Sequence, residues 1–304
     1  MKAIKKSDFI GKTYAKIRLF SKAYFPVLHA KLAYRLAYGK RCNLEKPSTF
    51  SEKLLWLSLN TYRNNLLVME LCDKYLVRKY VTSHASAKYL NDVIRVYNNI
   101  DEIKYDELPD QFALKISQGC ATNIFCESKK VFSKHEFDKI MKEWSKGQFL
   151  YNKVMANVGG IPVCKLKKYY ICEKYLKETG KKSPTDYKFY CFGGEPKAIL
   201  VISDRFEEKK GIFMSTNWEI LGELSDAYKK PSTLYTRPES LDEMINVARL
   251  LSKDFPFVRV DLYDLAGEVI FGEMTFFPNG CIHPQETIID GKTMGELLEL
   301  PTQI

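Results

Sequence analysis

The sequence predicts an α+β protein, because helices and mostly antiparallel strand pairs alternate in blocks along its 304 residues. Capping-box patterns, in which Ser or Thr is followed three residues later by Glu, begin helices at 49–52, 133–136 and 240–243. Apolar runs around glycine turns predict hairpins over 186–204 and 257–277. No segment is repeated or of low complexity, which excludes repeat and disordered architectures.

The expected organisation has four segments: a basic helical leader (1–45), an N-terminal helical region (46–110), a small lobe (111–168) and a large lobe (169–304). In the helical region, a second helix is expected over about 66–81. The small lobe should contain a strand over 112–117 and another through 124–125, joined by a polar loop. The large lobe should begin with a strand over 169–176.

Eight cysteines lie singly in apolar segments, with no Cys-x-x-Cys pair and no clustering with the four histidines. This pattern predicts buried free thiols, a reducing compartment, and neither a disulfide framework nor structural zinc. No apolar stretch long enough for a signal-peptide core or a membrane span follows the basic first residues. The expected location is therefore the cytosol.

The net charge of +10 is concentrated at one end of the chain. Residues 1–41 contain eleven basic residues and one acid, Asp8, and the rest of the chain is balanced. This distribution argues against a nucleic-acid enzyme with a basic channel through its body. The leader is expected either to contact an anionic membrane as a basic amphipathic helix, or to fold back onto the protein through Phe20, Tyr24, Phe25 and Leu28.

The 257–277 hairpin carries the clearest chemical pattern. Arg259 and Asp261 alternate with apolar residues on one strand, and Glu273 and Thr275 alternate on the return strand, together with Phe271 on their face. With a three-residue loop at 266–268, Asp261 lies opposite Glu273 and Arg259 opposite Thr275.

Two opposed carboxylates repel each other unless a cation lies between them or one is protonated. Magnesium is commonly held by one or two carboxylates together with nucleotide phosphates, and Arg259 is placed to contact a phosphate oxygen. The alternative is an Arg-Asp-Glu ion network on an exposed sheet face.

Two pieces of this hairpin, Arg259-Val260-Asp261 and Glu273-Met274-Thr275, are followed by Pro278-Asn279-Gly280 and resemble the final hairpin of the ATP-grasp superfamily. From about residue 43 to the C-terminus, the chain more closely resembles the TupA-like ATP-grasp family of teichuronopeptide and capsular polysaccharide biosynthesis. Five ordered blocks carry this resemblance: PSTFSEKL (47–54), DKYLVR (73–78), LPDQF (108–112), DYKF (186–189) and FGE (271–273). It implies an ATP-grasp fold, in which two α+β lobes clasp ATP.

The resemblance also implies roles for individual residues. Lys115 would reach the nucleotide phosphates, and Glu173 would lie at the hinge between the lobes. The remaining implied contacts are adenine against Tyr175 and Leu176, ribose on Asp186, phosphate on Lys188, Arg205 and Arg259, and magnesium on Asp261, Glu273 and Thr275. Lys115, Arg205 and Arg259 would be the catalytic residues, and ATP and Mg²⁺ the cofactors.

By the same resemblance, the γ-phosphoryl group of ATP passes to a carboxylate, and an amine attacks the resulting acylphosphate to form an amide. The implied partners are a uronic-acid-containing surface polysaccharide or its precursor and an amino acid or other amine. Two alternatives are a glycosyltransferase and a non-catalytic nucleotide- or glycan-binding relative. The sequence has no Asp-x-Asp motif of the kind that many glycosyltransferases use.

Two positions depart from the family pattern. The loop over 117–123, which would cover the phosphates, contains only Gly119 where the family is glycine-rich. Thr275 stands where the wider superfamily has a metal-binding asparagine, and its hydroxyl is a poorer magnesium ligand than an amide oxygen.

Overall fold

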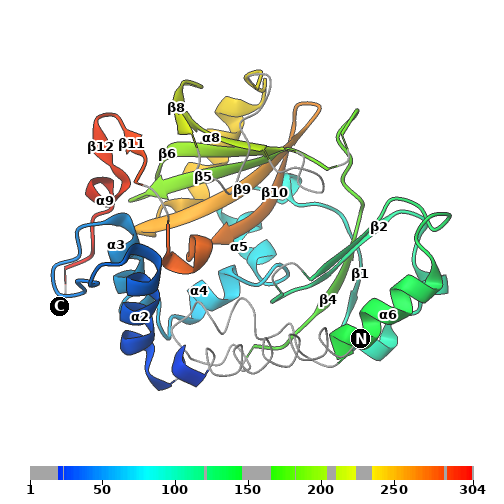
Figure 1. Cartoon of the computed structure of the whole chain (residues 1–304). Coiled ribbons are helices and arrows are strands. Elements are labelled where there is room, and N and C mark those ends of the chain that lie inside the picture. The colour runs from blue at the N-terminus through cyan, green and yellow to red at the C-terminus, as the bar shows by residue number, and fades with distance from the viewer. Residues whose placement is uncertain are drawn as a thin grey trace.

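The protein is described from a computed structural model over residues 20–22, 24–119, 122–145, 166–181, 183–203, 210–223, 235–283 and 286–302. It has the predicted α+β architecture (Figure 1). A four-stranded sheet and a six-stranded sheet organise the two lobes, and their strand pairings are antiparallel.

The four-stranded sheet forms the small lobe. Its order is β1 (Val93–Tyr97), β4 (Tyr170–Glu173), β2 (Phe112–Ile116) and β3 (Asn123–Cys126). One face is buried against α6 (Lys134–Ser145), which contributes Phe137 and Trp144 to the core. The sequence assigns β1 to the helical region and β4 to the large lobe, but both strands pair within this sheet. Periodicity indicates that a strand forms, whereas the choice of its partner is a tertiary property.

The six-stranded sheet forms the large lobe. Its order is β10 (Glu268–Thr275), β9 (Phe257–Leu265), β5 (Asp186–Phe192), β6 (Glu195–Ser203), β7 (Lys210–Ser215) and β8 (Ile220–Glu223). One face packs on α8 (Leu241–Ser252), whose Met244, Val247 and Leu251 are fully buried. The predicted hairpin turn between β5 and β6 is confirmed, because residues 193–194 are glycines with positive φ angles of 54° and 85°.

Four helices precede or flank the small sheet: α2 (Pro26–Tyr38), α3 (Phe50–Leu59), α4 (Leu66–Leu71) and α5 (Val77–His84). Short 3₁₀ turns follow at Ala87–Tyr89, Ile100–Glu102 and Tyr105–Glu107. The single helix expected over 66–81 is therefore two helices. Asp73 interrupts it, because its Oδ1 accepts from the backbone N–H groups of Tyr75 and Leu76 at 2.8 and 3.0 Å. Such local side-chain bonds compete with helix continuation.

The C-terminal segment returns to α3. It contains a 3₁₀ turn (Pro278–Cys281), the strands β11 (Ile288–Ile289) and β12 (Lys292–Thr293), and α9 (Met294–Leu297). The Nζ of Lys53 donates to the carbonyl oxygens of Gly295 and Leu298 at 2.7 and 2.8 Å. The capping box predicted at Thr49 is present at the start of α3, and a second capping box begins α9 at Thr293. Both segments that meet in this contact are therefore capped helices.

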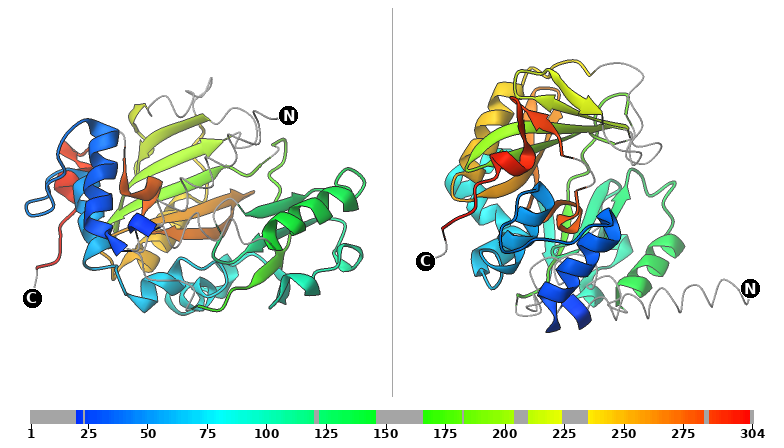
Figure 2. Two further views of the ribbon diagram at one scale, coloured as in Figure 1. Left: turned by 60° about the horizontal axis from the view of Figure 1, so that its bottom comes forward. Right: turned by 60° about the vertical axis from the view of Figure 1, so that its left-hand side comes forward.

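The leader is described from residue 20 onwards, and its main element is α2 at the periphery of the molecule (Figure 2). The expectation that Phe20, Tyr24, Phe25 and Leu28 pack on the protein is wrong, because all four are exposed. The helix packs instead through its opposite face, with Ala30 and Tyr34. Across the described ranges, every helix is too short or too polar to traverse a bilayer.

Candidate functional site

The β9–β10 hairpin has the predicted register. Asp261 pairs with Glu273, and Arg259 pairs with Thr275. The loop itself is shorter than expected: it contains two residues, 266–267, which have positive φ angles of 56° and 90°. A two-residue loop alone would move β10 by one position and turn Glu273 to the opposite face of the sheet.

A β-bulge at Gly272 restores the register. Phe271 pairs with Leu262 and Glu273 pairs with Asp261, so Gly272 is the extra residue. A Cβ atom at this position would lie 2.9 Å from the carbonyl oxygen of Asp261, which explains why glycine stands here. The bulge also turns Phe271 onto the apolar face beside Leu262. The expectation that Phe271 shares a face with Glu273 is therefore wrong.

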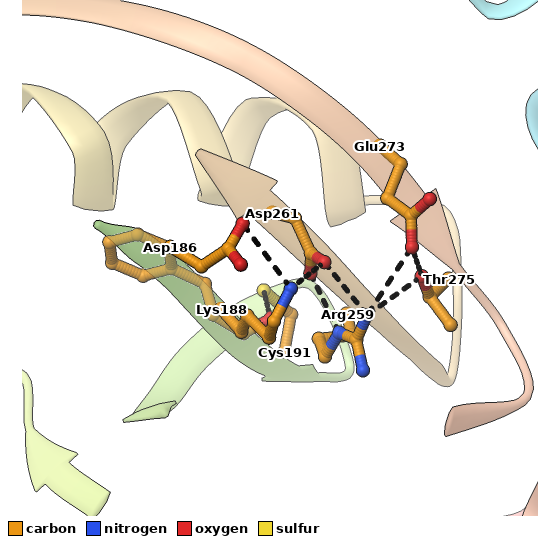
Figure 3. Close-up of polar contacts among 8 residues, drawn as sticks. Asp186, Lys188, Cys191, Arg259, Asp261, Glu273 and Thr275 are labelled. Carbon is orange, nitrogen blue, oxygen red and sulfur yellow. Dashed lines mark hydrogen bonds and ion pairs between the residues drawn. The ribbon is translucent and has the colours of Figure 1, made fainter. Parts of the chain in front are cut away.

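Arg259 joins the polar residues of the hairpin (Figure 3). Its Nε and Nη2 donate to the two carboxylate oxygens of Asp261 at 2.6 and 2.7 Å. Nη2 also lies 3.4 Å from Glu273 Oε1 and 3.1 Å from Thr275 Oγ1. The Thr275 hydroxyl donates in turn to Glu273 Oε1 at 2.9 Å. The carboxylates of Asp261 and Glu273 lie opposite each other and need a cation between them. The Arg259 guanidinium supplies part of this positive charge.

Strand β5 contributes a second cation and a third carboxylate. Lys188 pairs in register with Asp261, and its Nζ lies 2.5 Å from Asp261 Oδ2. The same Nζ lies 3.7 Å from Asp186 Oδ1. Asp261 thus accepts from Lys188 and from two guanidinium nitrogens of Arg259, Nε and Nη2. A carboxylate has about four lone-pair sites, so its acceptor capacity is not filled by these three contacts.

This network is buried rather than exposed. Asp186 and Asp261 retain 1% and 2% of their accessible surface, and Lys188 retains 6%. Burial alone would lower the pKa of the Arg259 guanidinium, but the nearby charge of Asp261 raises it overall. The Arg-Asp-Glu network offered as the alternative exists, but its expected position on an exposed face is wrong. Among the described residues, this face brings together three carboxylates, Asp186, Asp261 and Glu273, and two cations, Lys188 and Arg259.

The small sheet carries a second polar group, centred on Glu173 at the end of β4. Lys115 Nζ on β2 lies 2.5 Å from Glu173 Oε2. Two residues of the helical region also approach this carboxylate: Asn91 Nδ2 at 3.4 Å and Arg78 Nη1 at 3.8 Å. Glu173 is 5% exposed, so the carboxylate predicted to lie at the hinge is buried among three donors.

Lys115 and Glu173 share the face of the small sheet that is opposite its apolar core. Register places Asn123 of β3 and Ile171 of β4 beside Lys115. Leu114, on the alternate face, belongs to the core shared with α6. Among the described residues, the buried Asn123 Oδ1 has no hydrogen-bond partner. This face of the small sheet therefore presents the Lys115 ammonium group and, next to it, the Asn123 Oδ1 atom that accepts no hydrogen bond from the described residues.

The loop after β2 is fixed to the helical region at its start. Ser117 Oγ donates to Asp73 Oδ2 at 2.8 Å, and the backbone N–H of Lys74 donates to the Ser117 carbonyl at 2.9 Å. Lys74 Nζ also donates to the Gly119 carbonyl. Asp73 and Lys74 belong to the DKYLVR block, so that block connects the helices to the predicted phosphate loop.

The predicted site residues thus fall into two groups, one on the six-stranded sheet and one on the four-stranded sheet. Tyr175 and Leu176 are partly buried in the segment that leads from Glu173 and β4 towards Asp186 and β5. Arg205 lies outside the described residues. Sequence reasoning missed four further residues of these groups: Asp73, Arg78, Asn91 and Asn123. Asp73 and Arg78 belong to the DKYLVR block, one of the five blocks that carry the family resemblance. Membership of this block was the signal that could have identified them.

The hairpin side chains carry oxygen donors, which are the ligands that magnesium prefers. Asp261, Glu273 and Thr275 present oxygen atoms on one face of two neighbouring strands. Within the described ranges, no group of three or more His, Cys, Asp or Glu residues could hold a metal by itself. Two carboxylates are what magnesium requires when nucleotide phosphates and water complete its shell.

A family profile for TupA-like ATP-grasp proteins matches residues 52–298, which is most of the chain. The protein belongs to the TupA-like ATP-grasp family. This assignment confirms the resemblance inferred from the five sequence blocks and identifies the two lobes as those of an ATP-grasp fold. A comparison with curated proteins found no significant match.

Solved structures of ATP-grasp ligases are similar to this TupA-like chain at low identity. D-alanine–D-alanine ligase from Bacillus anthracis is 15% identical, with 69% of this chain and 59% of that chain covered and a TM-score of 0.40. The D-alanine–D-alanine ligase from Helicobacter pylori is 12% identical, with 70% of this chain and 56% of that chain covered and a TM-score of 0.37. The ATP-grasp ligase PsnB, complexed with minimal precursor, Mg and ADP, is 14% identical, with 74% of this chain and 57% of that chain covered and a TM-score of 0.35. The chain thus spans less than two thirds of the length of these structures.

Proposed function

We propose that this TupA-like protein is an ATP-dependent, magnesium-requiring ligase that joins a carboxylate to an amine. The observation that carries the proposal is the buried face on which Asp186, Lys188, Arg259, Asp261 and Glu273 converge. Magnesium is commonly held by one or two carboxylates together with nucleotide phosphates, and this face combines carboxylates with cations that can contact those phosphates. Membership of the ATP-grasp family supports ATP as the nucleotide.

In this proposal, Asp261 and Glu273 hold magnesium with the ATP phosphates, and Thr275 supplies a weaker oxygen donor. When bound, the ion neutralises charge on the phosphoryl oxygens. Arg259 keeps the Asp261 carboxylate oriented through two hydrogen bonds and has an Nη2 atom directed at Glu273. Lys188 and Arg259 have buried stems, so both can place a positive charge in a site from which water is excluded.

Lys115 approaches the phosphates from the small lobe, and Glu173 holds it in position at the hinge. Tyr175 and Leu176 would border the adenine, and Asp186 would accept from the ribose hydroxyls. Arg205 is retained as a further candidate for phosphate contact. Positioning and charge neutralisation are the main requirements of phosphoryl transfer, so no covalent enzyme nucleophile is invoked.

The reaction transfers the γ-phosphoryl group of ATP to a substrate carboxylate, which releases ADP and forms an acylphosphate. The amine then forms the C–N bond while inorganic phosphate leaves. We propose a uronic-acid-containing surface glycan or its precursor as the carboxylate and an amino acid or another amine as the nucleophile. Buried free thiols in the described part of the chain agree with a cytosolic site of action.

One assay tests the reaction class. ADP and phosphate release are measured with ATP, magnesium, a panel of amino acids and uronic-acid glycans, beside UDP release from UDP-sugars. ADP release that requires both a carboxylate and an amine supports the ligase. UDP release with no ATP turnover would instead establish the glycosyltransferase, and nucleotide binding without any turnover would establish a non-catalytic relative.

A further inference from the structure

The outward face of α2 presents a row of leucines to solvent. Leu28, Leu32 and Leu36 are 67%, 53% and 74% exposed. Their spacing of four residues places them one above another on a single side of the helix. Single exposed leucines need no explanation, but a continuous ridge of them does.

The helix cannot hide this ridge by rolling over. Its inner face is held by the buried Ala30 and Tyr34, and the Tyr34 hydroxyl lies 3.4 Å from Thr49 Oγ1. One turn later, the Tyr38 hydroxyl lies 2.8 Å from Ser51 Oγ. Both contacts reach the start of α3, which is itself closed by a capping box. The orientation of the leucine ridge is therefore fixed by the fold.

Three exposed aromatic side chains lie in the chain just before α2. Phe20, Tyr24 and Phe25 are each more than half exposed. The rings of Phe20 and Tyr24 have centroids 4.6 Å apart, so they form a joint apolar surface. Tyrosine is favoured at the boundary between lipid and water, and phenylalanine and leucine are typical of the apolar face of interfacial helices.

The charged residues of α2 and of the segment that follows it are all basic. Lys31 and Arg35 are exposed on the flank of α2 next to the leucines, and Lys40 and Arg41 follow the helix. No acidic residue occurs between positions 9 and 44 of the sequence. Long basic side chains of this kind can extend along an apolar surface while their charges remain in water.

We propose that α2 and the turn before it dock on an anionic phospholipid surface, with the leucine ridge and the aromatic residues in the interface and the basic residues on the headgroups. The 13-residue helix lies along the membrane and does not cross it. Exposed leucines give a nucleic acid nothing to bind, and two copies of this face would bring like charges together. The proposal is independent of the ligase chemistry.

The test uses the full chain and vesicles that contain phosphatidylglycerol, with pure phosphatidylcholine vesicles as the neutral reference. The variant Leu28→Gln/Leu32→Gln/Leu36→Gln removes the ridge and keeps every basic residue. The matched control, Leu66→Gln/Val131→Gln/Ile288→Gln, changes three exposed apolar residues elsewhere. We expect the wild type and control to sediment with anionic vesicles, and the ridge variant to lose at least tenfold in partitioning.

Added salt should weaken the binding of the wild type, because it screens the basic residues. Lys31→Gln/Arg35→Gln should reduce binding at low salt and flatten this dependence. Thermal unfolding shows whether the ridge variant is folded, and Leu36→Gln alone replaces it if it is not.

Three results would overturn the proposal. The wild type could remain in the supernatant with anionic vesicles. The folded ridge variant could bind as well as the wild type, which would assign any binding to basic residues elsewhere, including 1–19. Finally, sedimentation without lipid could show a wild-type dimer that the ridge variant does not form, which would make the ridge a contact between copies.

Discussion

Asp261 and Glu273 lie directly opposite each other on neighbouring strands, and the guanidinium of Arg259 lies against both carboxylates. Their environments nevertheless differ. Asp261 is almost fully buried and accepts from two cations, whereas the Glu273 side chain keeps 27% of its surface. The two carboxylates should therefore respond differently to substitution, although the proposed metal needs both.

Glu273→Gln should remove most of the stabilisation that magnesium and ATP give the wild type, while leaving the nucleotide-free protein near its wild-type melting temperature. A ligand at about 100 times its Kd stabilises by about 2.7 kcal/mol, which thermal unfolding detects readily. Glu268→Gln, an exposed change at the start of the same strand, is the control. An undiminished magnesium- and ATP-dependent shift in Glu273→Gln would exclude this residue from the metal site.

Asp261→Asn should lower the stability of the nucleotide-free protein itself. It removes the carboxylate nearest to Lys188 and Arg259 in a buried site and leaves the longer contacts to Asp186 at 3.7 Å and to Glu273 at 3.4 Å. Breaking a buried pair costs about 3–5 kcal/mol. Chemical denaturation without nucleotide measures this loss. A variant as stable as the wild type would mean that the network is more hydrated than its burial indicates.

Gly272→Ala should destabilise the hairpin and weaken the response to magnesium and ATP together. The added Cβ would contact the Asp261 carbonyl, and relieving such a clash costs about 1–3 kcal/mol. Denaturation and ATP-dependent thermal shifts are measured in parallel, with the exposed Glu268→Ala as the control. If the alanine variant keeps both properties, the bulge does not position Glu273 as proposed.

Lys115→Ala should lower the turnover of ATP by about 100-fold or more, the usual effect of removing one group that stabilises transition-state charge. ATP binding should weaken less, because Glu173 keeps Arg78 and Asn91 as neighbours when the lysine is absent. Steady-state kinetics and calorimetric binding separate the two effects, with the exposed Lys142→Ala as the control. Equal losses of turnover and binding would reassign Lys115 to binding alone.

Arg78→Met should raise KM for ATP more than it lowers kcat. Arg78 contacts Glu173, the proposed hinge residue, and donates to the Asn91 carbonyl at 3.0 Å, so we expect it to act by positioning and not on the transferred group. The loss should be clearest in nucleotide affinity. An unchanged KM with a lower kcat would point to a role at the reacting phosphate.

Cys42 and Cys172 should resist alkylation at pH 8 until the protein is unfolded. Burial raises the pKa of each thiol to about 11, so the reactive thiolate is scarce in the native state. The same shifts make the folded state lose stability as pH rises from about 9 through 11, since the unfolded thiols ionise first. Mass spectrometry of iodoacetamide-treated samples, native and in urea, checks the reactivity. Rapid native labelling of Cys172 would show that the β4 core opens.

Several parts of the fold follow from local sequence. The capping box at Thr49 and the glycine turn at 193–194 are set by bonds between near neighbours, and the structure contains both. The alternation of Arg259 and Asp261 with apolar residues fixes which side chains share a face, because side chains alternate along a strand. The register of the hairpin was predicted correctly with a loop one residue too long, since the Gly272 bulge supplies the missing residue.

Only the tertiary structure determined which charged side chains contact each other. Lys188 reaches Asp261 across 73 positions of sequence, and Lys115 reaches Glu173 across 58. Neither periodicity nor capping can report such pairs, because they depend on which strands become neighbours. The outward direction of the α2 leucines has the same origin. Sequence determined that α2 has apolar residues beside basic ones, but the packing of Ala30 and Tyr34 determined which of them face solvent.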